Sequence, residues 1–429
     1  MRFALVNPPW SFDGSIYFGC REPHLPLEYG YAKALIEAAG HEAEIFDGQL
    51  GALSREAIAD LVASYAPDIA VVTTAPSYLF WRCAPPELRV PQEVVRDLRP
   101  IVPTIVAVGP HASTTPTTTL AKLGVDAAVI GECEEILPRL AAPREEWEHI
   151  PSLCRWVDGT PQATGPTHSA NMTQLPPLRW PAATIEAHRH HHHRFDAPPQ
   201  RPGAEMETSR GCPYHCTFCA KDNFRNAYRK RPLPTLLEEL DALAAQGIEY
   251  VYFIDEIFLP NRDLLRALEG RGVNIVVQTR IALWNFETID LLGRAGCVSI
   301  EAGVESISEQ GRNLLDKNSR LTTDQITDRL IYARERVPFV QANLIDAQVD
   351  NPDEVERWRE HLQRYGVWAN RPVPLFPYPG SPDYTKRWGA PDDRAWERAL
   401  DYYLEQYHEF SDIQDDRPLS LEALELKVQ

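Results

Sequence analysis

The chain has 429 residues, which is enough for two or three domains that each bury a hydrophobic core. Its 61 Asp and Glu residues outnumber the 43 Lys and Arg residues, and the formal net charge is −18. A chain this acidic lacks the broad basic surface that nucleic acids and anionic membranes bind, so neither is an expected partner.

The sequence also favours a cytoplasmic protein. No run of about 18 apolar residues predicts a transmembrane helix. Met1 leads into a short apolar run that lacks the longer apolar core and the cleavage site of a signal peptide. The eight cysteines are too few for a disulfide scaffold, and three of them stand at metal-binding spacing, which indicates a reducing compartment.

Residues 1–140 alternate short apolar runs with helical patterns. We expect strands at residues 3–6, 41–46, 68–73, 104–108 and 127–130, and helices at 27–39, 55–65, 90–98 and 117–123. This alternation predicts a doubly wound α/β domain around a parallel sheet. Ligands of such sheets bind outside the carboxyl ends of the strands, which here carry polar residues and glycines.

Residues 141–203 form a predicted linker that is rich in Pro and polar residues. The linker contains the tract 188–194, in which five His residues are interleaved with two Arg residues. Such a tract can chelate metal ions. The favoured interpretation is nevertheless a solvated linker whose metal affinity is incidental.

Strand–helix alternation resumes at residue 204 and predicts a partial (β/α)6 barrel over residues 204–385. We expect strands at residues 206–209, 250–254, 274–279, 297–302 and 339–345, an extended segment at 373–379, and helices at 233–246, 261–269, 286–295, 323–334 and 353–365. Active sites of such barrels lie at the carboxyl ends of the strands. Residues 386–429 are expected to form a short, acidic helical tail without recognisable chemistry.

A Cys-x3-Cys-x2-Cys motif at Cys212, Cys216 and Cys219 follows the first predicted barrel strand. Three thiolates can hold a [4Fe–4S] cluster and leave its fourth iron without a protein ligand, and open coordination sites are where metals perform chemistry. Two alternatives remain at this point: a zinc site completed by His215, or an electron-carrier cluster completed by Cys297.

The cysteine motif, with Phe218 just before its last Cys, resembles that of the radical S-adenosylmethionine (SAM) enzymes. The resemblance covers most of residues 204–385, and it implies that the three cysteines carry the catalytic cluster and that Phe218 contacts the adenine of SAM. The other SAM contacts that it implies are Asp255, Glu256, Arg280, Glu305, Ser306 and Asn343. The family's Gly-x-Pro-Gly after the fifth strand is replaced here by Asp-Ala-Gln-Val at residues 346–349.

The N-terminal domain resembles the cobalamin-binding domain that is fused to many radical SAM enzymes. The matching stretches are residues 7–9, 108–112 and 130–134. The cobalamin-type site that this resemblance implies is lined by Thr74, Ser77, Gly109, His111, Gly131 and Glu132. The Asp-x-His-x-x-Gly run that supplies an axial His in other cobalamin proteins is absent, as it is from many fused members.

Aromatic residues crowd the loops after the first and third strands of this domain, at positions 10, 12, 17, 18, 78, 80 and 81. They can stack on a corrin ring, or they can fill the space that it would occupy. Cys20 and Cys83 belong to the same loops and would suit a thiophilic substrate such as trivalent arsenic, although two unrelated cysteines are the favoured interpretation.

Together the resemblances imply a transferase that cleaves SAM reductively and methylates a small molecule with the help of cobalamin, in natural-product or secondary metabolism. Related cobalamin-dependent radical chemistry, such as ring formation or rearrangement without methyl transfer, is a further option within the same family. The resemblances also imply an external one-electron donor such as flavodoxin or ferredoxin. One alternative omits cobalamin and transfers a 3-amino-3-carboxypropyl group to an acceptor such as trivalent arsenic, as in arsinothricin-type biosynthesis. A remote alternative is a non-catalytic iron–sulfur or cobalamin sensor, which the lack of a recognisable output domain disfavours.

Overall fold

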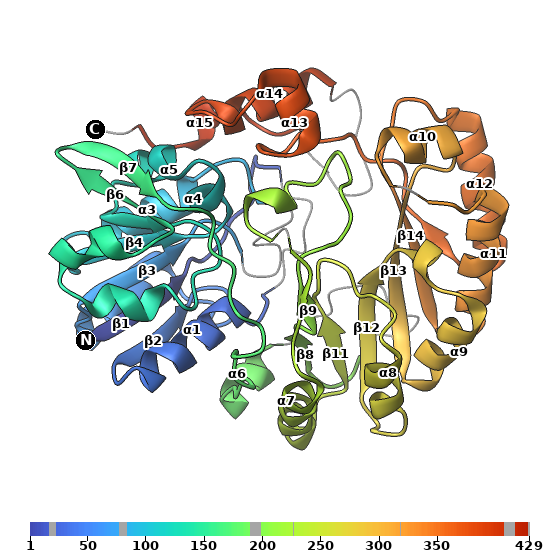
Figure 1. Cartoon of the computed structure of the whole chain (residues 1–429), viewed down its shortest axis with the longest axis horizontal. Coiled ribbons are helices and arrows are strands. Elements are labelled where there is room, and N and C mark those ends of the chain that lie inside the picture. Colours follow the sequence, from blue (N-terminus) through green and yellow to red (C-terminus); the bar gives the residue numbers. More distant parts are fainter. Residues whose placement is uncertain are drawn as a thin grey trace.

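Two α/β units, each built on a sheet, make up the protein (Figure 1). The computed structural model describes residues 1–16, 23–76, 84–188, 199–225, 227–317, 319–406 and 417–427. The N-terminal sheet lies on the left of Figure 1, the second sheet lies to its right, and the C-terminal helices lie across the top. None of the helices in these ranges combines the length and the apolar composition that crossing a lipid bilayer requires.

The N-terminal sheet has the strand order β2-β1-β3-β4-β5-β6-β7. Its strands are β1 (Arg2–Asn7), β2 (Glu42–Asp47), β3 (Ile69–Thr73), β4 (Thr104–Val108), β5 (Ala127–Val129), β6 (Leu153–Val157) and β7 (Thr160–Thr164). Strands β1 to β5 are parallel, and β1, β3 and β4 are almost wholly buried, as in a sheet covered on both faces. The helices of this unit are α1 (Leu27–Ala38), α2 (Arg55–Tyr65), α3 (Arg89–Leu98), α4 (Pro110–Thr114) and α5 (Pro116–Leu123). The predicted doubly wound α/β domain is confirmed.

The segment 141–203, expected to be a solvated linker, contains regular structure. Strands β6 and β7 form a hairpin that pairs with β5 in antiparallel fashion, and helix α6 (Ala182–Ala187) follows. The sequence does not predict β7, because most of its residues are polar and exposed and so form no apolar pattern. Leu178 and Trp180 join the core of the second unit, and His188, the first residue of the His tract, is only 1% exposed. The expectation of a solvated segment is therefore wrong for these described residues.

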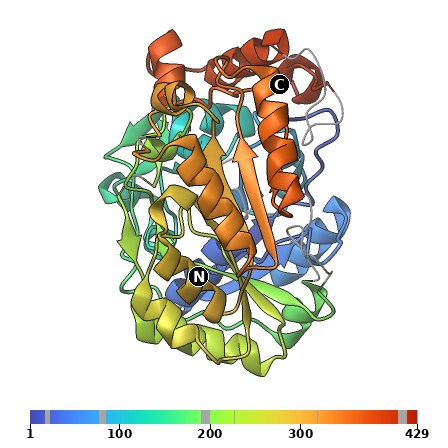
Figure 2. The same cartoon turned by 90° about the vertical axis from the view of Figure 1, so that its right-hand side faces the viewer.

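The second sheet is all parallel and has the order β15-β14-β13-β12-β11-β8. Its strands are β8 (Gly203–Met206), β11 (Tyr250–Phe253), β12 (Asn274–Thr279), β13 (Cys297–Glu305), β14 (Phe339–Leu344) and β15 (Trp368–Ala369). The helices that accompany them are α7 (Leu233–Ala245), α8 (Arg262–Leu268), α9 (Phe286–Arg294), α10 (Glu309–Leu314), α11 (Thr323–Arg334) and α12 (Pro352–Arg364). Figure 2 shows the yellow and orange helices in front of this sheet. β8 and β15 stand at opposite edges, so the predicted partial barrel is confirmed.

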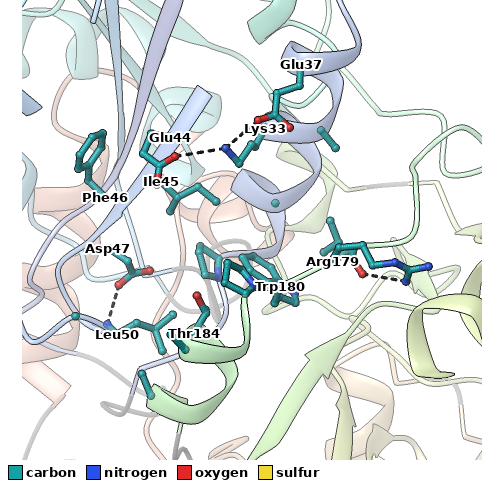
Figure 3. Close-up of a pocket in the computed structure, with 18 of the residues that line it drawn as sticks. Lys33, Glu37, Glu44, Ile45, Phe46, Asp47, Leu50, Arg179, Trp180 and Thr184 are labelled. Atoms are coloured by element: carbon teal, nitrogen blue, oxygen red, sulfur yellow. Dashed lines mark hydrogen bonds and ion pairs between the residues drawn. The ribbon is translucent and has the colours of Figure 1, made fainter. Parts of the chain in front are cut away.

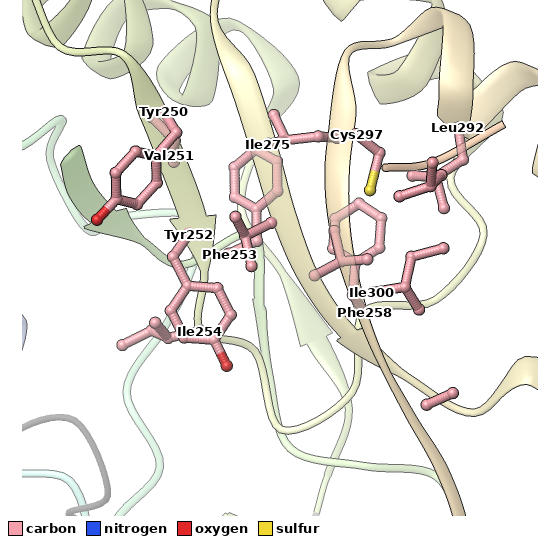
Figure 4. Packing of buried hydrophobic residues seen from close by; sticks show 14 of the residues in the cluster. Tyr250, Val251, Tyr252, Phe253, Ile254, Phe258, Ile275, Leu292, Cys297 and Ile300 are labelled. Atoms are coloured by element: carbon pink, nitrogen blue, oxygen red, sulfur yellow. The ribbon is translucent and has the colours of Figure 1, made fainter. Parts of the chain in front are cut away.

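The barrel core is formed by apolar side chains of the strands and of the helices behind them. Figure 4 labels Val251, Phe253, Ile275 and Ile300 among the buried side chains of this core. The sixth strand of the sheet is β15 and not the extended segment expected at residues 373–379. Within that segment, Val373 forms an isolated bridge to Ile345. The prolines after residue 371 remove backbone donors and so prevent a longer strand there.

The C-terminal tail covers the carboxyl-end side of both sheets. It forms α13 (Pro382–Trp388), α14 (Ala395–Gln406) and α15 (Leu421–Leu424), which span the top of Figure 1. Phe376, Trp396 and Tyr403 pack in one buried cluster with Ile16 and Ala75 of the N-terminal unit. The tail thus encloses the space in which parallel α/β sheets bind their ligands.

Candidate functional site

The cysteine loop (residues 211–220) lies between β9 (Ser209–Arg210) and the short helix η4 (Lys221–Asn223), and β9 pairs with β10 (Arg229–Lys230). Gly211 has a φ of +79°, and a Cβ there would lie 2.2 Å from the carbonyl oxygen of Ala227, so only glycine fits. Cys212, Cys216 and Cys219 are free and partly buried. Burial raises the pKa of Cys219 to about 12, and a coordinated iron would counteract this because metals deprotonate their thiol ligands.

Neither Cys297 nor His215 lies in a position that favours it as a fourth ligand of the three cysteines. Cys297 stands at the first residue of β13, in the hydrophobic core, and donates to the carbonyl oxygen of Ser299 at 3.4 Å (Figure 4). The cysteine loop instead follows the carboxyl end of β8. His215 is exposed to solvent. Cys212, Cys216 and Cys219 are therefore left as the candidate ligands of a cluster with one open iron, and this assignment stays a prediction.

Arg280, predicted to bind the SAM carboxylate, directly follows β12 and is 6% exposed. Its guanidinium lies 4.2 Å from the ring centroid of Tyr214, a residue of the cysteine loop. Within the described part of the chain, Nε and Nη1 of Arg280 have no hydrogen-bond partner. A buried, unpaired guanidinium is costly, and a carboxylate ligand would satisfy it in a forked geometry. The residue therefore fits its predicted role.

Asp255 and Glu256, predicted to meet the SAM ammonium group, hold the base of the cysteine loop. Asp255 accepts hydrogen bonds from the backbone N–H of Thr208 at 2.7 Å and from two neighbouring hydroxyls, and burial raises its pKa to about 7. Glu256 accepts from the N–H of Gly211 at 2.7 Å and pairs with Arg225 at 2.5 Å. Both carboxylates thus fix the loop itself.

Phe218 and Glu305, both predicted SAM contacts, are linked through Lys317. The Nζ of Lys317 donates to Glu305 at 2.5 Å and lies 6.0 Å from the ring centroid of Phe218. Glu305 has a φ of +68°, a left-handed conformation that non-glycine residues rarely adopt. Such backbone strain at a strand end often accompanies a functional site.

Two other predicted SAM contacts are engaged locally. The hydroxyl of Ser306 donates to Asp350 at 2.6 Å, and Ser306 is fully buried. Asn343 lies on β14 and accepts a hydrogen bond from Gln341 at 2.6 Å. These bonds order the ends of β13 and β14, and a role for either side chain toward SAM stays a prediction.

The N-terminal sheet presents its own set of buried polar groups at the carboxyl ends of β3 and β4. The hydroxyls of Thr73 and Thr74 have no hydrogen-bond partner among the residues described, and neither ring nitrogen of His111 forms a well-aligned hydrogen bond. Burial lowers the pKa of His111 to about 3, and its ring stacks on Trp396 of α14 at 4.1 Å. Gly109 precedes α4 with a φ of +117°. These groups fit a polar ligand better than an apolar one.

Gly131, predicted to line the cobalamin-type site, lies close to the backbone of another segment of the protein. Its φ is +97°, and a Cβ there would lie 2.3 Å from the carbonyl oxygen of His168. Gly131 therefore admits the segment after β7, which sequence reasoning had not foreseen. The predicted site residues Ser77, Cys20 and Cys83 lie outside the described residues.

Glu132, predicted to line the cobalamin-type site, joins the two units. It is fully buried and accepts hydrogen bonds from Arg229, at 2.5 Å, and from Arg210, at 3.2 Å, both of the barrel unit. It also accepts from the N–H of Ala170 at 2.7 Å. Burial raises the pKa of Glu132, but the arginines, Arg210 foremost, lower it further, to about 2. Arg210 also pairs with Glu207 at 2.8 Å. The buried ion pairs between the two units therefore include a residue that stands two positions before Cys212.

Asn223 is a bridging residue that sequence reasoning missed. Its Nδ2 donates to Thr114 of the N-terminal unit at 3.2 Å and to the carbonyl oxygen of Pro379 at 2.8 Å. Gly380 has a φ of +87°, and a Cβ there would lie 2.2 Å from the Asn223 amide. In the sequence, Gly380 was the signal of this close approach.

Two family models match the chain, and together they cover both units. The model described as "Radical SAM superfamily" matches residues 206–362, and the model described as "B12 binding domain" matches residues 21–141. Among curated proteins, an uncharacterized methyltransferase of Pyrococcus horikoshii is 24% identical over 93% of this chain and 83% of its own length. The hopanoid C-3 methylase of Methylococcus capsulatus is 27% identical over 40% of this chain and 35% of its own.

Solved structures show the same architecture. The radical SAM methyltransferase TsrM from Kitasatospora setae, solved with cobalamin and a [4Fe–4S] cluster, aligns with a TM-score of 0.66 and 20% identity over 89% of this chain and 76% of that one. The cobalamin-dependent radical SAM enzyme OxsB aligns with a TM-score of 0.66 and 16% identity, and this chain spans 57% of its length. The cysteine loop after the first barrel strand, the N-terminal sheet and the two matching family models agree. The chain thus carries a B12-binding domain followed by a radical SAM domain.

Proposed function

We propose that this protein is a cobalamin-dependent radical SAM methyltransferase that acts on a small molecule. One observation carries the proposal: the carboxyl ends of the two sheets are tied together around the cysteine loop, by Asn223 on one side and Glu132 on the other. Each of those ends also retains buried polar groups without protein partners in the described residues. This arrangement suits two ligands that react with each other.

The barrel side would bind the cluster and SAM. The thiolates of Cys212, Cys216 and Cys219 would hold a [4Fe–4S] cluster, which supplies the electron for reductive cleavage of SAM. Arg280 would pair with the SAM carboxylate and so fix the orientation of the molecule relative to the loop. Helices α13 to α15 cover the site and limit the access of water.

The N-terminal side would bind cobalamin, which carries a methyl group when bound. Thr73 and Thr74 offer hydroxyls, and Gly109 allows a close backbone approach. Because the pKa of His111 is about 3, its imidazole is neutral near pH 7 and can donate or accept a hydrogen bond without burying a charge.

The relatives support a small-molecule acceptor and a biosynthetic role. TsrM has also been solved with a tryptophan substrate, and a tryptophan 2-C-methyltransferase of Streptomyces laurentii is 24% identical over 37% of this chain. We extend the proposal to a compound of that size, to a cytoplasmic setting and to an external one-electron donor such as flavodoxin or ferredoxin.

Anaerobic reconstitution tests the proposal without knowledge of the substrate. The protein is loaded with iron and sulfide, with and without hydroxocobalamin, and is then given SAM and a strong reductant. We expect S-adenosylhomocysteine to form only when hydroxocobalamin is bound, because the corrin then accepts the methyl group. Methylthioadenosine as the main product would instead indicate carboxypropyl transfer, and the absence of any SAM-derived product would indicate a sensor.

The same preparation provides an independent binding measurement. After gel filtration, the visible spectrum should retain one corrin per chain, both in the wild type and in Cys219→Ala. The variant should form no SAM-derived product, since it lacks a cluster ligand. Loss of the corrin from the wild type during gel filtration would contradict the proposed second cofactor.

A further inference from the structure

Three side chains of metal-ligand type converge away from the cysteine loop, near the junction of α6 with β8. His24 stands in the segment before α1, Glu205 lies within β8, and His188 directly follows α6. Their exposed fractions are 2%, 1% and 1%. One ligand atom of each lies within 4.8 Å of the corresponding atoms of the other two. Separate parts of the chain therefore bring two imidazoles and one carboxylate to a single buried point.

The hydrogen bonds around His188 define which nitrogen faces the carboxylate. Nδ1 lies 2.9 Å from the carbonyl oxygen of Gly203, and Nε2 lies 2.8 Å from Oε2 of Glu205. A carbonyl oxygen only accepts, so Nδ1 carries the proton and Nε2 presents a lone pair in the neutral ring. A backbone carbonyl behind the far nitrogen is the support that metal-bound histidines commonly have.

The carboxylate requires a cation between itself and this imidazole. In the neutral tautomer, the lone pair of His188 Nε2 would face an oxygen that also only accepts. On the other side, Nδ1 of His24 lies 2.8 Å from Oε1 of Glu205. Either a proton on His188 or a metal ion shared by the three side chains resolves the conflict.

We propose that His24, His188 and Glu205 form a binding site for a divalent transition metal, with Zn²⁺ as the preferred ion. Two imidazoles and one carboxylate are borderline nitrogen and oxygen donors, and this set occurs in both Zn²⁺ and non-haem Fe²⁺ sites. The metal would connect the N-terminal unit, the α6 segment and the first barrel strand, whose carboxyl end leads into the cysteine loop. Its role is to fix the barrel edge against the N-terminal unit.

A neighbouring cavity and a neighbouring carboxylate support the proposal. A cavity of about 630 Å³ is lined by Pro26, two residues after His24, and by Ala187, which precedes His188. Asp47 also lines this cavity (Figure 3). Burial raises the pKa of Asp47 to about 6, although its carboxylate accepts hydrogen bonds from Asn7, Leu50 and Gln49. The cavity therefore adjoins chain neighbours of two of the three ligands and carries an acidic group of its own.

Metal analysis of a variant without cluster cysteines tests the site. In Cys212→Ala/Cys216→Ala/Cys219→Ala, iron and zinc bound by the cysteine loop are removed from the count. This full-length parent is incubated anaerobically with Zn²⁺ or Fe²⁺ alone, desalted and assayed for metal content. We expect one Zn²⁺ ion per chain. Adding Glu205→Gln should weaken Zn²⁺ affinity on the order of 100-fold while circular dichroism stays the same.

A matched control is available in His168, which also pairs with a glutamate, Glu135, at 2.9 Å but belongs to no group of three metal-type ligands among the described residues. His168→Gln in the same parent should retain the ion. If Glu205→Gln fails to fold, zinc-edge X-ray absorption is measured on the parent and on the same protein with the histidines at residues 190–193 replaced by Ala, because that His tract can also chelate metal ions. An imidazole and oxygen shell without sulfur in both proteins supports the site. A sulfur-containing shell, or a parent that retains no Zn²⁺ or Fe²⁺, would overturn it and leave a proton-linked His188–Glu205 pair.

Discussion

Two buried arginines flank the cysteine loop, and they differ in what surrounds them. Arg210, on the side of the N-terminal unit, is fully buried and pairs with Glu132, Glu134 and Glu207. Arg280, on the barrel side, stacks on Tyr214 and has two guanidinium nitrogens without partners in the described chain. The comparison separates two uses of a buried charge. A charge that the protein itself compensates holds the units together, whereas an uncompensated one is suited to an anionic ligand.

The largest effect is expected from replacing the cysteines of the loop that lies between the two arginines. Cys212→Ala, Cys216→Ala or Cys219→Ala should each abolish SAM cleavage, since the cluster loses one of its three protein ligands. Cluster content is read from iron analysis and electron paramagnetic resonance, and cleavage from the SAM-derived products. Cys154→Ala, a buried cysteine of β6, is the control and should keep both. Turnover by any of the three loop variants would contradict the cluster assignment.

Removing the compensation of Arg210 should produce the next largest effect. Glu132→Gln leaves Arg210, Arg225 and Arg229 facing a neutral amide, and breaking a buried ion pair from one side costs about 3–5 kcal/mol in the free energy of unfolding. Denaturant unfolding measures the loss. Glu287→Gln, which breaks the exposed pair with Arg262, should not change the unfolding curve measurably. Equal curves for the two variants would show that Glu132 does not join the units.

A substitution of Arg280 should affect ligand binding and not stability. Arg280→Lys keeps the positive charge but loses the fork that binds a carboxylate at two points, so SAM should bind roughly 10-fold to 100-fold more weakly. Equilibrium dialysis with SAM measures the affinity, and iron content shows that the cluster is intact. Because Nε and Nη1 of Arg280 have no hydrogen-bond partner among the described residues, the unfolding curve should shift little. Unchanged SAM affinity would exclude Arg280 from the SAM site.

The smallest expected effect is a pH dependence in the N-terminal unit. Burial lowers the pKa of His111 to about 3, below the value near 6.5 of the unfolded chain. Between these values only the unfolded state takes up the proton, so the folded state loses up to about 1.4 kcal/mol per pH unit as the pH falls below about 6.5. This contribution is fully present above pH 6.5.

His111→Phe tests that dependence, since it keeps the stacking on Trp396 and removes the titrating group. The difference in unfolding free energy between wild type and variant should therefore change between pH 7 and pH 5, in favour of the variant at pH 5. Denaturant unfolding at both values measures it. A difference that stays constant with pH would mean that His111 is protonated in the folded state.

Local sequence patterns predicted most elements and the residues at the strand ends. The apolar runs of β1, β3 and β4 and the spacing of Cys212, Cys216 and Cys219 are features of short segments, so they can be recognised without knowledge of the fold. The resemblance to known families, and not a local pattern, pointed to Arg280 as a SAM contact, which stays a prediction. It also placed Glu132 in a ligand site, where the structure shows an ion pair with Arg229, 97 residues away.

The errors arose where partners are distant in sequence. The linker expected at residues 141–203 contributes β6, β7 and the buried His188, whose carboxylate partner Glu205 also binds His24, 181 residues before it. In the tail, which was expected to lack chemistry, the ring of Trp396 stacks on His111. The indole N–H of Trp396 also donates a hydrogen bond to the hydroxyl of Thr115, which lies 281 residues earlier in the chain. No periodicity within a segment encodes such contacts.

The sequence by itself determined the two α/β units and the cysteine loop, because strand and helix periods and the spacing of three thiols are properties of neighbouring residues. Only the tertiary structure decided which polar residues are compensated by the protein and which remain for a ligand. That distinction depends on what stands within hydrogen-bonding distance in the folded chain, as Arg210 and Arg280 show. Burial makes it decisive, because a buried polar group without a partner is costly and a paired one is not.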